Sequence, residues 1–201
     1  MIVSRNRIGV FLDRDGTISQ EIGYILEINK FSLYDYSVEA IKKLNSLGVK
    51  VIVVTNQACV ARGLCSEDTV QSVNQRMINL LKSEGAFLDD VFFCPHHIEG
   101  TVDEYTIDCP CRKPKIGMIS EAVSKNDIEV TESFVVGDKI SDIQMGFNAG
   151  TRTILLLTGH GRNALNEIKN NNLKMPHFIA ENLLEASDII YREVQNLYIT
   201  A

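Results

Sequence analysis

The chain lacks an excess of positive charge: its formal net charge is −6 over 201 residues. Proteins that bind nucleic acids or anionic membrane surfaces in a general way are normally basic, and no basic tract interleaved with aromatic residues occurs here. No hydrophobic run approaches the roughly 20 residues that a membrane-spanning helix needs. We therefore expect neither nucleic acid nor membrane as a partner. The N-terminal residues lead straight into a strand-like run, so we expect no signal peptide and a cytoplasmic protein.

The sequence also lacks the features of a small disulfide-stabilised domain. Its five cysteines sit in a chain of ordinary hydrophobic content (45%), so a disulfide framework is not expected. Cys59 and Cys65 are isolated from the other cysteines in the sequence, and most such cysteines are small buried hydrophobic side chains. Neither an internal repeat nor a low-complexity segment occurs. The length allows one substantial core, and we expect a single domain over residues 1–201 that need not be more than a monomer.

Short apolar runs alternate with helical patterns along the chain. The apolar runs predict buried strands at Ile8–Leu12, Val49–Thr55, Asp90–Phe93, Ser133–Gly137, Thr153–Leu157 and His177–Ala180. Helices are expected over Ser37–Leu47, after Ser66, from a capping box at Ser141–Gln144, and after Asn182. This alternation predicts an α/β fold, a three-layer Rossmann-like parallel sheet with helices on both faces. The polar and irregular stretch from Pro95 to Pro114 is the exception.

Two carboxylates follow the first predicted strand. Asp13 and Asp15 are two residues apart, so their side chains can converge on one side of the strand end. Ligands of open parallel sheets usually bind at the carboxyl ends of the strands. A pair of acids there can hold a hard cation and supply a nucleophile, or can be only a polar strand end that leads into the turn at Gly16.

Polar side chains also follow two later strands. Thr55-Asn56-Gln57 offers a hydroxyl and two amides that suit a phosphate oxygen, although such residues are common at strand ends. Asp138, after Gly137, can serve as an oxygen ligand of Mg²⁺. Asp142 either orients a neighbour or only stabilises the first turn of a helix. Arg112-Lys113-Pro114 is either solvated surface or the local positive charge that a phosphate site needs.

These four strings occur in the order of the motifs of the haloacid dehalogenase-like (HAD-like) phosphatases, which the chain resembles from about Ile8 to Gly150. Within that superfamily, Asn56–Gly63 and Cys94–Met118 are similar to the D-glycero-D-manno-heptose 1,7-bisphosphate phosphatases. Histidinol-phosphate phosphatases are close relatives. The intervals between the motifs are filled by predicted elements, so no large cap domain is expected.

The resemblance implies an Mg²⁺-dependent phosphatase that acts through an aspartyl-phosphate and removes the C7 phosphate in nucleotide-activated heptose synthesis. The alternatives are a histidinol-phosphate or broader sugar phosphatase, and a binding protein without turnover, which the intact acids and lysine disfavour. Implied catalytic residues are the nucleophile Asp13, the general acid and base Asp15, and the phosphoryl-stabilising Thr55 and Lys113. Implied Mg²⁺ ligands are Asp13, the backbone carbonyl of Asp15, and Asp138. Implied contacts to the phosphosugar are Glu21, Ile22, Gly23, Tyr24, Asn56, Gln57, Arg112 and Lys139.

A group of three cysteines and one histidine suits tetrahedral Zn²⁺. A loop separates the pair Cys94 and His96 from the pair Cys109 and Cys111, and the residue types fit a structural zinc site. The one-residue gaps are tighter than usual, His97 is an alternative ligand, and free thiols or a redox pair are the competing interpretation. The resemblance favours His96. A closed zinc site within an insertion over residues 94–114 would fold an otherwise coreless loop and fix the basic pair that follows it.

Overall fold

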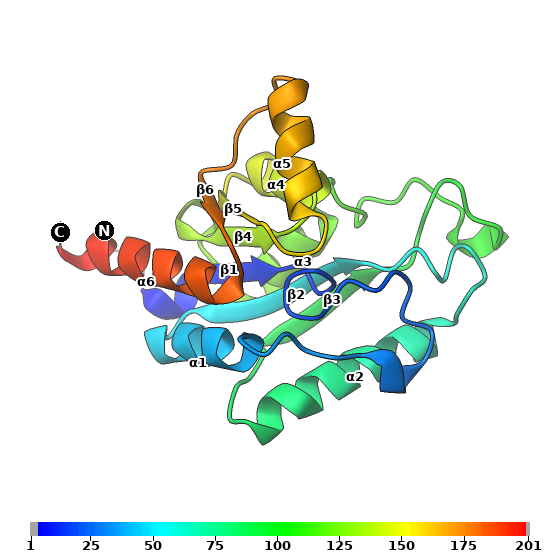
Figure 1. The fold of residues 1–201 in the computed structure, drawn as a ribbon, viewed down its shortest axis with the longest axis horizontal. Coiled ribbons are helices and arrows are strands. Elements are labelled where there is room, and N and C mark those ends of the chain that lie inside the picture. The colour runs from blue at the N-terminus through cyan, green and yellow to red at the C-terminus, as the bar shows by residue number, and fades with distance from the viewer. Residues whose placement is uncertain (1–3, 200–201) are drawn as a thin grey trace.

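A computed structural model of the protein describes residues 4–199, which form a six-stranded parallel sheet in the order β3-β2-β1-β4-β5-β6 (Figure 1). The strands are β1 (Gly9–Leu12), β2 (Lys50–Asn56), β3 (Asp90–Cys94), β4 (Phe134–Gly137), β5 (Arg152–Leu156) and β6 (Phe178–Ala180). All neighbours pair in parallel. Each predicted strand is present within two residues of its predicted bounds.

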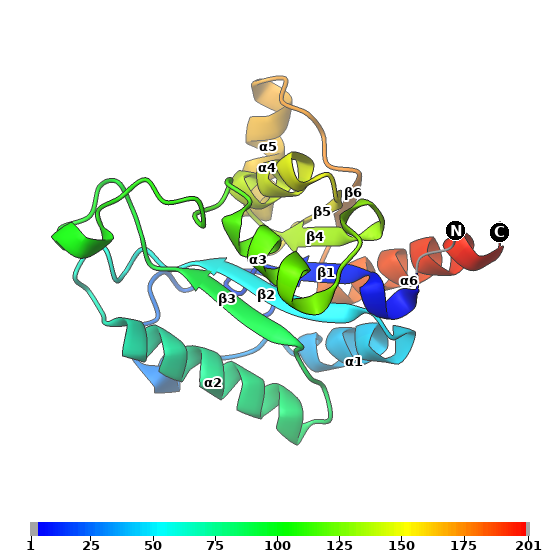
Figure 2. The same ribbon diagram turned by 180° about the vertical axis from the view of Figure 1, so that it is seen from behind.

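Helices cover both faces of this sheet. They are α1 (Ser37–Leu47), α2 (Glu67–Ser83), α3 (Gly117–Asn126), α4 (Ile140–Ala149), α5 (Gly161–Asn170) and α6 (Leu183–Ile199). Figures 1 and 2 show α1, α2 and α6 on one face and α3, α4 and α5 on the other. Because successive strand side chains point to opposite faces, Val10 and Leu12 join the core under α1 and α6, whereas Phe11 packs with α3. The predicted three-layer fold without a large cap is confirmed.

Two predicted helix starts are confirmed by their side-chain caps. Ser66 Oγ accepts the backbone N–H of Thr69 at 3.2 Å, and Asn182 Oδ1 accepts that of Glu185 at 3.1 Å. In both cases a short polar side chain satisfies an N–H group that the first helical turn leaves without a partner.

The predicted capping box at Ser141 is wrong. Helix α4 begins at Ile140 with Lys139 in the capping position, and Asp142 Oδ2 accepts the N–H of Lys139 at 2.9 Å. The acid that closes the first turn is therefore Asp142, and the helix starts sooner after β4 than the Ser141–Gln144 pattern indicates. Helix α3 was not predicted, because its buried Met118, Ile119 and Ala122 make too short an apolar stripe to stand out.

The parallel strands bring all the motif residues to one edge. The residues after β1, β2 and β4 lie at the carboxyl ends of adjacent strands, and the segment 95–114 extends outward from the same end of β3 (Figure 2). Apart from a three-residue 3₁₀ turn at Asp103–Tyr105, that segment is irregular, as predicted. Among the described helices, none has the length and apolarity needed to cross a membrane.

Candidate active site

A buried lysine lies between two carboxylates at the centre of this edge. Lys113 Nζ is 2.9 Å from Asp13 Oδ1 and 2.6 Å from Asp142 Oδ1, and it donates to the carbonyl oxygen of Val54 at 3.0 Å. The lysine is only 4% exposed. A charge buried to this degree is stable only when it is paired and hydrogen-bonded, and these three acceptors meet that requirement.

The charges around Asp13 keep it ionised. Burial alone would raise its pKa, but the nearby Lys113 and Lys139 outweigh burial and lower the pKa of Asp13. Burial would likewise lower the pKa of Lys113, and the two facing carboxylates raise it instead. Asp13 therefore presents a carboxylate, which is the form that a nucleophile requires.

Asp138 is held between two glycine backbones. A Cβ at Gly16 or at Gly159 would lie 2.2 Å from Asp138 Oδ2, and both glycines have positive φ angles, +82° and +49°. The N–H of His160 donates to the same oxygen at 2.7 Å. The other oxygen, Oδ1, is buried without a hydrogen-bond partner. Burial and the neighbouring Asp13 raise the pKa of Asp138 to about 8.

These acids fit a divalent cation. Single carboxylate oxygens of Asp13, Asp138 and Asp142 all lie within 4.8 Å of one another. Three acids face only Lys113 and Lys139, so a bound cation would be needed to keep all three ionised at neutral pH, and the partnerless Asp138 Oδ1 is an oxygen ligand of the kind that Mg²⁺ prefers. The oxygens of Asp142 are already engaged by Lys113 and the N–H of Lys139, so Asp13 and Asp138 are the better ligands.

The side chain of Asp15 is not part of that acidic group and lies in a separate network. Arg14 Nε donates to Asp15 Oδ1 at 3.0 Å and Arg14 Nη2 donates to Oδ2 at 2.8 Å. Ser19 Oγ contacts Oδ1 at 3.1 Å, and Gln57 Nε2 donates to Oδ2 at 3.0 Å. Arg14 Nη1 also donates to Asn74 Oδ1 of α2 at 2.8 Å. Asp15 is therefore held by donors on both of its oxygens.

The polar residues that end β2 link the motifs. Gln57 Nε2 also donates to Thr55 Oγ1 at 2.9 Å, so one amide joins Thr55 to Asp15. Asn56 Oδ1 accepts the N–H of Lys113 at 3.1 Å, and its Nδ2 donates to the Lys113 carbonyl at 3.2 Å. The side chain of Asn56 thus holds the backbone that carries the buried lysine.

The predicted substrate contacts around Glu21 lie at the rim. Glu21 Oε2 is 2.8 Å from Lys139 Nζ and 3.5 Å from His160 Nε2, and Glu21 Oε1 accepts the N–H of Gly23. Ile22 and Tyr24 beside them are exposed. A surface hollow opens next to Lys139 and His160, between α4 and α5. The rim therefore presents both charge and exposed apolar surface close to the carboxylates.

The four predicted zinc ligands converge. The sulfurs of Cys94, Cys109 and Cys111 lie 2.9 to 3.3 Å from one another. His96 Nδ1 is 3.7 Å from the Cys94 sulfur and 3.5 Å from the Cys111 sulfur. His97 faces away, because its Nδ1 accepts the N–H of Glu99 within its own turn. This cluster is able to hold a metal such as zinc.

The zinc-type cluster is connected to the carboxylate site through Arg112. This residue directly follows Cys111, and its Nη1 donates to the carbonyl oxygen of His96 at 3.0 Å. The next residue is the buried Lys113. Lys113 is therefore only two residues from Cys111, so a loss of order in the cluster would also displace the lysine.

Sequence reasoning missed three contributors to the site: Arg14, Asn74, and the turn Thr158-Gly159-His160. Arginine is rarely buried, and strand alternation alone would predict that Arg14 points to the side opposite Asp13 and Asp15, so nothing local marked it. The turn after β5 had a usable signal, since it follows another strand at the same sheet edge. Its Thr158 Oγ1 donates to the carbonyl of Gly16.

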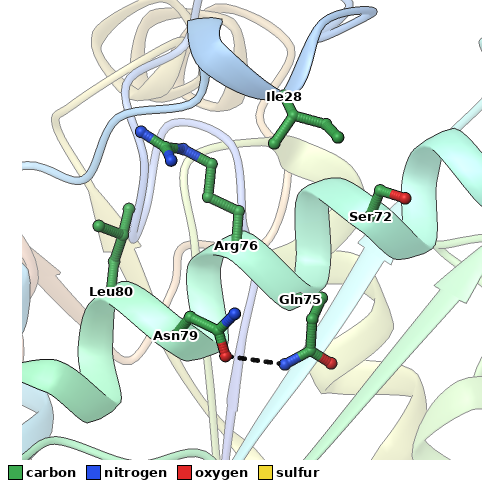
Figure 3. A pocket seen from close by; sticks show the side chains of 6 residues that line it. All are labelled: Ile28, Ser72, Gln75, Arg76, Asn79 and Leu80. Carbon is green, nitrogen blue, oxygen red and sulfur yellow. Dashed lines mark hydrogen bonds between the residues drawn. The ribbon is translucent and has the colours of Figure 1, made fainter.

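A second hollow lies between the segment around Ile28 and helix α2 (Figure 3). It is lined by Ile28, Ser72, Gln75, Arg76, Asn79 and Leu80. Figure 3 shows no carboxylate or imidazole among these side chains. It therefore lacks the groups that phosphoryl transfer needs, in contrast to the edge described above.

Comparisons with known proteins agree with this chemistry. A HAD-hydrolase-like family model matches residues 110–186. The chain is 38% identical to D-glycero-beta-D-manno-heptose-1,7-bisphosphate 7-phosphatase of Pasteurella multocida, over 90% of this chain and 95% of that protein. It is 42% identical to D-glycero-alpha-D-manno-heptose-1,7-bisphosphate 7-phosphatase of Photorhabdus laumondii, over 85% and 96%. A solved D,D-heptose 1,7-bisphosphate phosphatase of B. bronchiseptica, complexed with magnesium and phosphate, superimposes with a TM-score of 0.81 at 29% identity, over 92% of this chain and 99% of that one.

Proposed function

The chain belongs to the D-glycero-D-manno-heptose-1,7-bisphosphate 7-phosphatases, which are HAD-like phosphoric monoester hydrolases, and on this premise we propose the reaction of its own site. The substrate is the 1,7-bisphosphate of D-glycero-D-manno-heptose, and the products are inorganic phosphate and D-glycero-D-manno-heptose 1-phosphate. The reaction serves nucleotide-activated heptose synthesis in the cytoplasm. The observation that carries the proposal is the buried Lys113 between Asp13 and Asp142, beside the partnerless oxygen of Asp138.

Asp13 is the nucleophile in the first step. Its carboxylate attacks phosphorus in line, the bond from phosphorus to the C7 oxygen breaks, and an aspartyl-phosphate forms. Asp13, the Asp15 backbone carbonyl and Asp138 would hold Mg²⁺, which would supply the positive charge that offsets the repulsion between the carboxylate and the phosphate. Lys113 and Thr55 stabilise the oxygens of the transferring phosphoryl group.

Asp15 transfers the protons. In the first step it gives a proton to the leaving C7 oxygen, and in the second it takes one from the water that attacks the aspartyl-phosphate. Phosphate then leaves and Asp13 returns to its carboxylate form. The two roles require one side chain to face the leaving oxygen and then the water, and the bonds on both oxygens of Asp15 restrict its motion.

The zinc-type cluster supports this site without taking part in the chemistry. Zn²⁺ bound by Cys94, His96, Cys109 and Cys111 would have no open position, so its role is to order the segment 94–114. Arg112 and the rim residues Glu21, Tyr24 and Lys139 contact the sugar and its second phosphate. The exposed surface beside Lys139 leaves room for a phosphosugar without a cap domain.

Phosphate release in the presence of Mg²⁺ tests the proposal. The substrates are both anomers of the heptose 1,7-bisphosphate and histidinol phosphate, with Asp13→Asn as the matched variant of the nucleophile. We expect release from a heptose bisphosphate that is abolished in the variant. Preferential release from histidinol phosphate would refute the assignment of the substrate. Release by Asp13→Asn at the wild-type rate would refute the assignment of Asp13 as the nucleophile.

A further inference from the structure

Arg14 is the most completely buried cationic side chain next to the reaction centre, and the mechanism above assigns it no role. It is 1% exposed, and its side-chain hydrogen bonds go to two residues, Asp15 and Asn74. Two parallel bonds join the guanidinium to the Asp15 carboxylate in the fork arrangement that only arginine provides. Such an arrangement fixes the plane of the carboxylate as well as its position.

The third guanidinium bond explains how the fork itself is held. Asn74 lies on α2 and is buried, and its Oδ1 accepts from Arg14 Nη1 at 2.8 Å. Asn74 shares the buried face of α2 with Val73 and Met77, which pack into the core under the sheet. The orientation of Asp15 is therefore set from a helix whose own position is fixed by core packing.

We propose that Arg14, supported by Asn74, is the positioning residue for proton transfer by Asp15. The inference rests on the proposed function, in which Asp15 gives a proton to the leaving oxygen. As that proton moves, the bond from hydrogen to the Asp15 oxygen breaks, a bond from hydrogen to the leaving oxygen forms, and Asp15 becomes a carboxylate. The adjacent guanidinium stabilises the negative charge that develops on Asp15, so its contribution is larger in the transition state than in the ground state.

Leaving-group chemistry separates this role from a merely structural one. The sugar oxygen of the heptose bisphosphate leaves as an alcohol and needs a proton, whereas the nitrophenolate of p-nitrophenyl phosphate leaves without one. Both esters use the same nucleophile and the same phosphoryl-binding groups. A defect confined to Asp15 therefore affects kcat/KM strongly for the first ester and weakly for the second.

The test compares wild-type protein with Arg14→Lys, which keeps the positive charge and removes the fork. We expect kcat/KM for the heptose bisphosphate to fall by about 100-fold and that for p-nitrophenyl phosphate by no more than about threefold, because general acid catalysis contributes about 100-fold or more. The loss should be in kcat, since Arg14 is buried away from the substrate. Asp15→Asn should show the same pattern, and the double variant should lose no more than Asp15→Asn alone.

Asn74→Ala provides a second, milder variant if Arg14→Lys does not fold, as judged by circular dichroism and thermal melting. Its kcat/KM should again fall more for the heptose bisphosphate than for p-nitrophenyl phosphate, but by a smaller factor. The two bonds from Arg14 to Asp15 remain in this variant, and only the support from Asn74 is removed. Equal losses on the two esters, or unchanged kcat/KM for the heptose bisphosphate in the folded variants, would overturn the role of Arg14. A wild-type protein that hydrolyses neither ester would instead refute the proposed function, and this inference with it.

Discussion

Replacing Gly159 by alanine should displace the carboxylate of Asp138. A Cβ at this position would lie 2.2 Å from Asp138 Oδ2 and 2.8 Å from the Cα of Gly16. Both distances are well inside van der Waals contact, so the carboxylate must move by roughly 1 Å to clear the methyl group. The same substitution also places alanine at a φ of +49°, in the left-handed region.

The two effects have different magnitudes and different readouts. The left-handed conformation should lower the free energy of unfolding by about 1–2 kcal/mol. A misplacement of about 1 Å at a reacting site can lower the rate by about 100-fold. We therefore expect Gly159→Ala to fold, to lose about two orders of magnitude in kcat/KM, and to need more Mg²⁺ for half-maximal activity.

Gly150→Ala is the matched control. Gly150 ends α4 with a φ of +81°, and a Cβ there would meet nothing within 4 Å. This variant therefore carries the backbone strain without the clash. Urea unfolding and phosphate release over a range of Mg²⁺ concentrations should be measured for both. The reasoning fails if Gly159→Ala has the same kcat/KM and the same Mg²⁺ dependence as Gly150→Ala.

Three further predictions concern the groups around Lys113. Lys113→Met leaves Asp13 and Asp142 buried without their cation, so urea unfolding should show a loss of about 3–5 kcal/mol, and little loss would contradict the buried pairing. Asn56→Ala removes the two bonds to the Lys113 backbone, and kcat should fall by about tenfold while the melting temperature changes little; a change in KM alone would point to substrate contact instead. Cys109→Ser should lower the bound zinc measured by atomic absorption and the melting temperature together, with reduced but measurable phosphate release; full zinc content would show that the cluster is not the zinc site.

The order of elements and the identity of the reacting groups were accessible from the sequence. Strands buried on both faces produce continuous apolar runs. Asp13, Thr55 and Asp138 stand at the carboxyl ends of three such runs, so the sequence could place them at one edge of a parallel sheet. The ordered motifs named the family, which the comparisons confirm. The grouped Cys94, Cys109 and Cys111 predicted a metal cluster from residue type alone.

Other features required the folded chain, because they depend on contacts between residues far apart in sequence. Asp142 could be read as a helix cap or as an orienting group, and the structure shows it doing both, through Lys139 and Lys113. The guanidinium of Arg14 donates a hydrogen bond to Asn74, 60 residues further along the chain. Asp138 is enclosed by Gly16 and Gly159, which belong to the ends of different strands.

The physical division is between local and non-local interactions. Periodicity, capping residues and the chemistry of a motif act over a few neighbouring residues, so the sequence alone determined which groups stand at the ends of which strands. The direction in which each group points is set by partners brought close only when the helices pack on the sheet. Tertiary structure alone therefore decided that Lys113 lies between two acids and that the arginine holding Asp15 is itself held by Asn74 of α2.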